Sequence, residues 1–303
     1  MAKPSIQYLQ RHEINTQKWD SCIDTASNGL IYAYSKYLDK MATHWDGLII
    51  NDYEAVFPLP WRKKYGFYYL YPPYLTAQLG LFGNNINQEL FTSVIESIPK
   101  KFRYWDYNLN HKNLYSIEGF DFQQRVNYVL NLQKPYDELK RNYRESTVRN
   151  IKKSKEYSNV IEKDIPISAI ADLVLDNGLL TNEGELNRFM ELYQLLHKQN
   201  KAMTYGVSNS SNQLIASAAF LFSHNRAYYI LVGNHPNGRT LGASHALIDR
   251  FISDHAGKEL ILDFEGSDIR NLAFFYSSFG AIEEYYASIK RNQLPIYLRW
   301  LKN

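Results

Sequence analysis

The sequence predicts an α/β protein with mixed (α+β) sheets, built from two tandem units with a cleft between them. Apolar strand patterns alternate with amphipathic helix patterns, and the order of these patterns in the first half of the chain recurs in the last third. A length of 303 residues suits two domains of ordinary size, and a hydrophobic fraction of 45% is ample for packed cores. We place the boundary in a basic stretch, so that the units span 1–135 and 136–303.

In the first unit, helical spacing gives way to three strands, a further helix and two more strands. The 25 tyrosines and 15 phenylalanines favour strands with half-buried aromatic faces, or an open cleft lined by rings. The expected elements are helical segments within 16–41, strands at 48–50, 55–59 and 65–70, a helix at 86–98, and strands at 102–107 and 125–132.

The second unit opens with a charged helix, expected at about 136–157. Its Lys and Arg side chains are consistent with a binding surface for tRNA or another polyanion, but a solvated helix face is the commoner explanation of such a basic cluster. The remaining elements are a strand at 158–163, helices at about 168–177 and 184–199, strands at 203–207, 213–222 and 226–232, a helix at 243–255, a strand at 259–264, a helix at 271–279 and a strand at 283–290.

Bulk properties exclude several classes of protein. A net charge of +3 is too small to imply DNA or RNA binding by itself, and the single cysteine, Cys22, rules out an intramolecular disulfide. The N-terminus lacks the apolar run of a signal peptide and no segment approaches the length of a membrane span, so we expect a cytoplasmic protein. The histidines lack compact ligand spacing, so no metal site is expected.

One loop has the composition of an anion-binding loop. The apolar strand at 229–232 runs into a loop rich in Gly, Asn and Pro, which leads into an amphipathic helix. The first N–H groups of a helix have no internal partner and lie at the positive end of its dipole, and Gly242 and Ala243 leave room for a phosphate to approach. The alternative is an ordinary strand–turn–helix connection.

A second group of polar residues follows the next strand. Asp263 and Glu265 are two residues apart, so a continued strand would place both carboxylates on one face, where their proximity would raise one pKa towards neutrality. The alternative is a surface pair, or a cap for the turn at Ser267. Tyr276, four residues before a helix-ending Gly280, is either an ordinary core aromatic or a proton donor.

These motifs, in this order, resemble the GNAT acyltransferase superfamily. Arg239, Gly242 and Ala243 match its loop, which binds the pyrophosphate of acyl-CoA, while a splayed strand pair accepts the pantetheine arm. Asn271 and Tyr276 match its later helix, where the tyrosine often protonates the departing thiolate. The donor-binding residues that this resemblance implies are Val232, Gly233, Asn234, Arg239, Gly242, Ala243, Ser244 and Asn271.

The duplicated order narrows the resemblance to the FemABX branch, whose members transfer amino acids from aminoacyl-tRNA to peptidoglycan precursors. The run Tyr71-Pro72-Pro73, the Arg/Tyr pattern at 141–153 and the segments 263–267 and 275–281 are similar to that branch. The chain has no heptad run long enough for the coiled-coil arm that well-known members insert. Transfer RNA is therefore the less favoured partner.

The resemblance implies an N-acyltransferase or aminoacyltransferase with no permanently bound cofactor. It would move an acyl or aminoacyl group from acyl-CoA or aminoacyl-tRNA to an amine acceptor, such as a cell-wall or envelope precursor. Such aminolysis needs a base, an oxyanion donor and an acid for the leaving group. We expect Glu265 and Asp263 as candidate bases, Tyr276 as the acid, and a backbone N–H near Val232 or Gly233 as the oxyanion donor.

The first unit is expected to supply the acceptor side. Pro72 and Pro73 stand where the anion loop would be, and proline has no N–H to donate. The expected walls of the acceptor site are Trp61, Tyr71, Tyr74 and Gln78. Two alternatives remain open: a non-catalytic binding module on the duplicated scaffold, and a tRNA- or envelope-linked interaction protein that uses the basic helix.

Overall fold

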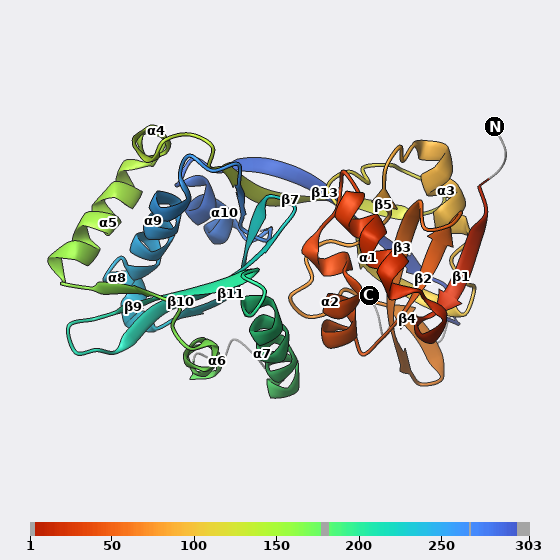
Figure 1. Ribbon diagram of the computed structural model, residues 1–303, viewed down its shortest axis with the longest axis horizontal. Coiled ribbons are helices and arrows are strands. Elements are labelled where there is room, and N and C mark those ends of the chain that lie inside the picture. Colours follow the sequence, from red (N-terminus) through yellow and green to blue (C-terminus); the bar gives the residue numbers. More distant parts are fainter. Residues whose placement is uncertain (1–3, 177–181, 267, 296–303) are drawn as a thin grey trace. The chain divides into compact units, whose positions relative to one another are not determined.

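The chain folds into two compact units in the computed structural model, which describes residues 4–176, 182–266 and 268–295, without the side chains of Arg239 and Thr240 (Figure 1). Unit 1 comprises Met1–Arg125 and Tyr285–Asn303, and unit 2 comprises Val126–Glu284. This division differs from the sequence-based segments 1–135 and 136–303. The chain leaves unit 1 before residue 135, and the end of the second segment returns to unit 1.

Unit 1 contains a mixed sheet whose strands run in the order β1-β2-β3-β4-β6-β13, with β5 paired to β3. All neighbours are antiparallel except β4 and β6, which are parallel. Its elements are β1 (Ile6–Gln10), η1 (Arg11–Glu13), α1 (Thr16–Thr25), η2 (Ile31–Ala33), α2 (Ser35–Met41), β2 (His44–Ile50), β3 (Ala55–Lys64), β4 (Phe67–Leu70), β5 (Phe82–Gly83), α3 (Gln88–Glu96), β6 (Phe102–Asn108) and the later part of β13 (Ile282–Asn292).

Unit 2 contains a sheet of the same design, in the order β8-β9-β10-β11-β12-β7. Again a single neighbouring pair, β11 with β12, is parallel. Its elements are the later part of β7 (Asp121–Asn131), α4 (Tyr136–Arg141), α5 (Glu145–Glu156), β8 (Val160–Lys163), α6 (Ile167–Asp176), α7 (Glu183–His197), β9 (Ala202–Ser208), β10 (Leu214–Ser223), β11 (Arg226–Asn234), α8 (Pro236–Thr240), α9 (Ala243–His255), β12 (Ile261–Asp263) and α10 (Arg270–Ser277).

The repeated order expected from the sequence is present, and it is longer than expected. In each unit a first strand, two helices, three strands, a helix and a further strand follow one another, and each sheet is completed by a strand that arrives from the other half of the chain. The structure adds β1, which the sequence analysis did not predict. The two units differ after the second strand of the parallel pair: in unit 2, β12 is followed by the helix α10, whereas in unit 1, β6 is followed by residues 109–120, which are irregular.

Local sequence explains where several helices begin. Asn15, Asn87 and Asn182 are N-caps whose side-chain oxygens accept the backbone N–H three residues later, at 3.1, 2.9 and 3.3 Å. The expected charged helix at 136–157 is instead two helices, α4 and α5, separated by a break at residues 142–144.

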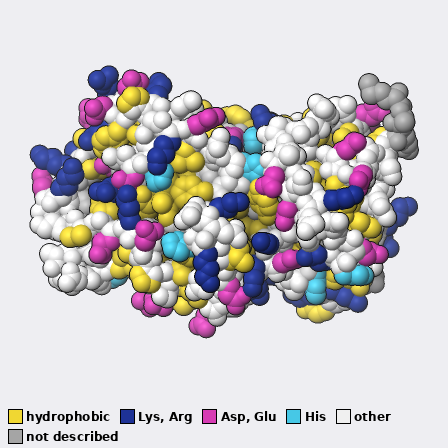
Figure 2. All heavy atoms as spheres, in the orientation of Figure 1, with side chains coloured by type: hydrophobic (Ala, Val, Ile, Leu, Met, Phe, Trp, Pro, Cys, Tyr) yellow, Lys and Arg dark blue, Asp and Glu magenta, His cyan; other side chains and the backbone are white. Residues whose placement is uncertain are grey.

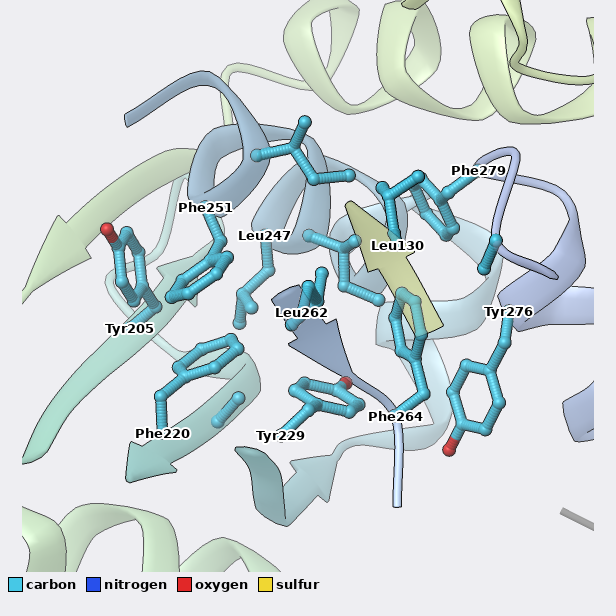
Figure 3. Close-up of a cluster of buried hydrophobic side chains, with 14 of the residues drawn as sticks. Leu130, Tyr205, Phe220, Tyr229, Leu247, Phe251, Leu262, Phe264, Tyr276 and Phe279 are labelled. Atoms are coloured by element: carbon cyan, nitrogen blue, oxygen red, sulfur yellow. The ribbon is translucent and has the colours of Figure 1, made fainter. Parts of the chain in front are cut away.

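The core of unit 2 lies between its sheet and helices α5 and α9, while α6 and α7 cover the opposite face (Figure 1). Aromatic rings from strands and helices dominate this core, as Figure 3 shows. Phe220 of β10 stacks on Phe251 of α9 with ring centroids 3.9 Å apart, and Tyr205 packs edge-on against both. These contacts hold α9, and therefore its N-terminus, in place over the sheet.

Candidate functional site

The parallel strands β11 and β12 of unit 2 separate after a short paired segment. Their register joins Arg226, Ala227 and Tyr228 to Ile261, Leu262 and Asp263, and β12 then ends, whereas β11 continues to Asn234. Beyond Tyr228, β11 is paired with β10 on its other side. About half of the backbone N–H and C=O groups in such a strand point away from its antiparallel partner. The edge of β11 from Tyr229 to Asn234 therefore has the geometry to receive an extended chain.

The N-terminus of α9 lies a short way along the chain from this open edge. Helix α8 occupies residues 236–240, where the sequence analysis expected a loop, and α9 begins at Ala243 as predicted. The Ser244 hydroxyl donates to Asn234 Oδ1 at 2.6 Å, which ties the first turn of α9 to the end of β11. The first N–H groups of this 13-residue helix lack intrahelical partners and carry the positive end of its dipole.

Gly242 was expected to leave room for a phosphate, but in the structure it allows close packing between α9 and α5. Its backbone is left-handed, with φ 68°, and a Cβ at this position would lie 2.2 Å from the carbonyl oxygen of Asn150 in α5. The space over Gly242 is therefore filled by α5, which packs against α9, and is not open to a phosphate. Gly242 and Ala243 are both buried, whereas Ser244 and His245, the next two residues of α9, are partly exposed and therefore accessible to an anion.

Asp263 is buried in an ionic network, which argues against its expected role as a base. Its side chain is 4% exposed, and Oδ2 lies 2.7 Å from Arg226 NH1. Its other oxygen accepts hydrogen bonds from Asn127 Nδ2 at 2.8 Å and from the backbone N–H of Glu265 at 2.9 Å. With its oxygens engaged in this way, Asp263 stabilises the end of β12 rather than accepting a proton from a substrate.

Glu265 does not continue the strand. Its φ of 67° is left-handed, so the alternation that would have placed it on the same face as Asp263 ends one residue earlier. The side chain is partly exposed, and its negative charge contributes to the raised pKa of Tyr276. Glu265 and Tyr276 are thus electrostatically coupled, whereas Glu265 and Asp263 are linked through the backbone.

Tyr276 lies on α10 against the aromatic core (Figure 3). Its ring stacks on Phe264 with centroids 4.7 Å apart, and its hydroxyl points away from the centre of the cluster. Burial first, and then the charge of Glu265, raise the pKa of Tyr276 above the ordinary value of 10. The side chain is therefore a neutral phenol at neutral pH, which is the protonation state that a general acid needs.

The other residues expected at the donor site are distributed along the same region of unit 2. Val232 and Asn234 are half-buried at the end of β11, and Gly233 is buried against Leu173 of α6. Asn271 is exposed on α10. Arg239 lies in α8, but its side chain is outside the described part of the structure. The roles of all these residues in donor binding remain predictions.

The four expected acceptor residues of unit 1 do not form a single wall. Trp61 stacks on His44 with centroids 4.4 Å apart and lines a pocket of about 260 Å³. Tyr71 instead packs under Arg62, the neighbour of Trp61 on β3, and neighbouring residues on a strand point to opposite faces. Gln78 is buried and accepts the backbone N–H of His111 at 2.8 Å, and Tyr74 is partly exposed on the loop after β4.

Sequence reasoning missed three residues that organise the end of β12: Asn127, Arg226 and Glu284. The guanidinium of Arg226 forms two contacts with Glu284, at 2.7 and 2.8 Å, besides its contact with Asp263. Arg226 opens a strand that is otherwise largely apolar, and this pattern could have identified it, whereas Asn127 lies in a strand with several other polar residues and does not stand out.

Two absences can be stated for the described residues. Among residues 4–176, 182–266 and 268–295, no group of three or more His, Cys, Asp or Glu side chains is close enough to hold a metal ion. Within the same ranges, no helix combines the length and the apolar composition that crossing a membrane requires.

Comparison with known proteins defines the class of fold. No family model matches the sequence, and no curated protein sequence matches it significantly. Solved structures do match along nearly its whole length, and the fold that they define, together with the two sheets of equal design, is a duplicated GNAT fold of the FemABX type.

The structure of FemX is similar to 98% of this chain and 99% of its own, with a TM-score of 0.67 and 13% sequence identity. A tandem GNAT protein from the clavulanic acid biosynthesis pathway matches 97% of this chain and 99% of its own, with a TM-score of 0.56 and 10% identity. The structure of L-PGS from Bacillus licheniformis matches 95% of each chain, with a TM-score of 0.56 and 10% identity. At such identities the likeness establishes the fold.

Proposed function

We propose that this protein is an N-acyltransferase that moves an acyl or aminoacyl group from acyl-CoA or aminoacyl-tRNA to an amine. One observation carries the proposal: β11 and β12 diverge after Tyr228, beside a helix N-terminus tied to the end of β11 through Ser244 and Asn234. An extended thioester arm can pair with the open edge of β11, and its phosphates can bind near the first turn of α9.

The chemistry follows from the groups around this opening. The amine attacks the acyl carbonyl, a C–N bond forms, and a backbone N–H of β11 stabilises the oxyanion. Glu265 takes the proton that the amine loses, the C–S or C–O bond to the donor breaks, and the Tyr276 phenol protonates the leaving atom. A proton passing from Glu265 to the Tyr276 phenolate then restores both side chains, so no external acid or base is consumed.

Unit 1 would bind the acceptor, because the described residues of unit 1 contain no counterpart of α10 and its phenol. The similarity to FemX, together with the resemblance of the sequence to the FemABX branch, supports an amine of a cell-wall or envelope precursor as the acceptor class that we propose. The exposed Lys and Arg side chains of α5 (Figure 2) are compatible with a tRNA donor, although Glu145 and Glu156 stand at the two ends of this helix.

A donor screen tests the proposal. The full chain is heated with CoA thioesters of different acyl length, with free CoA, and with aminoacyl-tRNA. A donor at about 100 times its Kd stabilises the folded state by about 2.7 kcal/mol, which for a domain of this size raises Tm by roughly 5–10 °C. Stabilisation by one donor class, followed by transfer of its acyl group to an amine, supports the proposal.

The variants Arg239→Ala and Tyr276→Phe then test the site. If both leave transfer from the responding donor unchanged, the assignment of the site is wrong. If no CoA compound or aminoacyl-tRNA stabilises the protein, the duplicated scaffold is a non-catalytic binding module.

A further inference from the structure

A buried polar network lies where β12 ends in unit 2. Arg226, 6% exposed, is placed between two carboxylates: NH1 lies 2.7 Å from Asp263 Oδ2 and 2.8 Å from Glu284 Oε2, and NH2 lies 2.7 Å from Glu284 Oε1. Burial acts to lower the pKa of Arg226, but the hydrogen bonds that it donates to Glu284 and the charges of both carboxylates raise the pKa, so this side chain stays charged. One cation thus holds two anions from different strands.

Asn127 of β7 connects this ionic cluster to the turn that follows β12. Its amide nitrogen donates to Asp263 Oδ1 at 2.8 Å and approaches Glu284 Oε2 at 3.4 Å. Its amide oxygen accepts the backbone N–H of Gly266 at 2.6 Å. Asn127 is 1% exposed, so all of these bonds are made away from water.

The network fixes the backbone on both sides of one peptide bond. Asp263 Oδ1 accepts the N–H of Glu265 at 2.9 Å, while Asn127 accepts the N–H of Gly266. Both residues are left-handed, with φ of 67° and 85°. This conformation is ordinary for glycine but uncommon for glutamate, and it persists where surrounding contacts stabilise it.

We propose that Asn127 and Asp263 are positioning residues that hold the Glu265–Gly266 turn, and through it the carboxylate of Glu265, beside the phenol of Tyr276. Arg226 and Glu284 in turn fix the orientation of Asp263. The inference rests on the proposed function for its catalytic meaning, but the arrangement itself does not depend on which donor binds.

Two facts favour positioning over simple stabilisation. Buried ion pairs are often no more stabilising than apolar residues of the same volume, so stability alone does not account for four polar groups at this place. Moreover, the side-chain oxygens of Asp263 and Asn127 accept the two backbone N–H groups of the turn that carries Glu265, and the charge of Glu265 acts on Tyr276.

Fluorine NMR of the full chain tests the proposal without a substrate. The protein is labelled with 3-fluorotyrosine, and the Tyr276 resonance is identified by its loss in Tyr276→Phe. Lowering the pH from 8 to about 3, below the ordinary pKa of a glutamate, moves the chemical shift of this resonance as Glu265 is protonated. Other carboxylates, such as Asp263, Glu283 and Glu284, can also contribute to this chemical-shift change. The contribution of Glu265 is the part of the chemical-shift change that is absent from Glu265→Gln.

In Asn127→Leu we expect the Glu265-dependent chemical-shift change to fall at least twofold, because the turn loses the hydrogen bond from the Gly266 N–H to Asn127. Asn127→Asp is the second variant: it keeps the size and the acceptor oxygen for Gly266 but places a carboxylate against Asp263. The matched control is Asn131→Leu, on the same strand but exposed and outside the network, which should keep the wild-type change.

A wild-type chemical-shift change in folded Asn127→Leu would overturn the proposal, as would the absence of any Glu265-dependent change in the wild type. With a donor found in the screen, the Asn127 variants should lower kcat at least tenfold and leave the donor KM within twofold. If the Glu265-dependent change of the Tyr276 fluorine resonance falls in Asn127→Leu but no donor supports acyl transfer, the proposed function is refuted while the positioning role stands.

Discussion

Replacing Gly242 by alanine tests whether this glycine serves packing or phosphate binding. The substitution introduces a Cβ at a left-handed position, 2.2 Å from the Asn150 carbonyl oxygen and 2.9 Å from its carbonyl carbon. Neither atom can rotate away, because both belong to the backbone of α5. Helix α5 or the start of α9 must therefore shift by about 1 Å for ordinary van der Waals contact to be restored.

The magnitude has two parts. A left-handed backbone costs an L-residue roughly 1–2 kcal/mol, and overpacking a buried contact costs about 1–3 kcal/mol. Gly242→Ala should therefore lower the free energy of unfolding by about 2–5 kcal/mol. Gly257→Ala is the matched control, because Gly257 has φ 80° and a Cβ added there would meet nothing within 4 Å, so only the first part applies.

Urea unfolding of the two variants, followed by far-UV circular dichroism, measures the difference directly. We expect Gly242→Ala to be less stable than Gly257→Ala by about 1–3 kcal/mol. Equal stabilities would refute the packing argument. If the two were equally stable and Gly242→Ala alone lost stabilisation by acyl-CoA, the sequence-based interpretation of Gly242 as a phosphate-approach residue would be restored.

Three further predictions concern charge and protonation. Arg226→Met should lower the free energy of unfolding by about 3–5 kcal/mol, because it leaves the buried Asp263 and the partly buried Glu284 without their cation. Arg250→Met is the comparison in urea unfolding, because the side chain of Arg250 is 49% exposed and its partner Asp254 keeps an ion pair with Lys163. Similar losses in the two variants would contradict the prediction. Tyr276→Phe should lower the transfer rate 10²- to 10⁴-fold with little change in donor affinity, and an unchanged rate in single-turnover assays would remove Tyr276 as the acid. Burial lowers the pKa of His245 from 6.5 to about 4, so between these pH values the unfolded chain binds a proton that the folded chain does not bind. The free energy of unfolding should therefore fall by up to about 3 kcal/mol as the pH drops from 6.5 to 4. In His245→Gln this fall should be smaller by the same amount, and an identical pH dependence of the two proteins would contradict the prediction.

Much of the fold was predictable because it depends on short-range pattern. The apolar periodicity located most strands and placed the start of α9 at Ala243, and the repeated order of elements revealed the duplication. The unit boundaries were not predictable in this way. They depend on where the last strand of each half pairs, and pairing between strands far apart in sequence leaves no local trace.

The candidate site was likewise predictable from the sequence only in part. Sequence by itself determined that a strand, a helix N-terminus, two carboxylates and a tyrosine follow one another in the second unit, because each is a feature of neighbouring residues. Only the tertiary structure decided their roles: α5 fills the space over Gly242, Arg226 engages Asp263, and a left-handed backbone turns Glu265 away from the strand. The physical reason is that burial and charge pairing depend on partners far away in sequence: Arg226 is 37 residues from Asp263, and Asn127 is 136 residues from it.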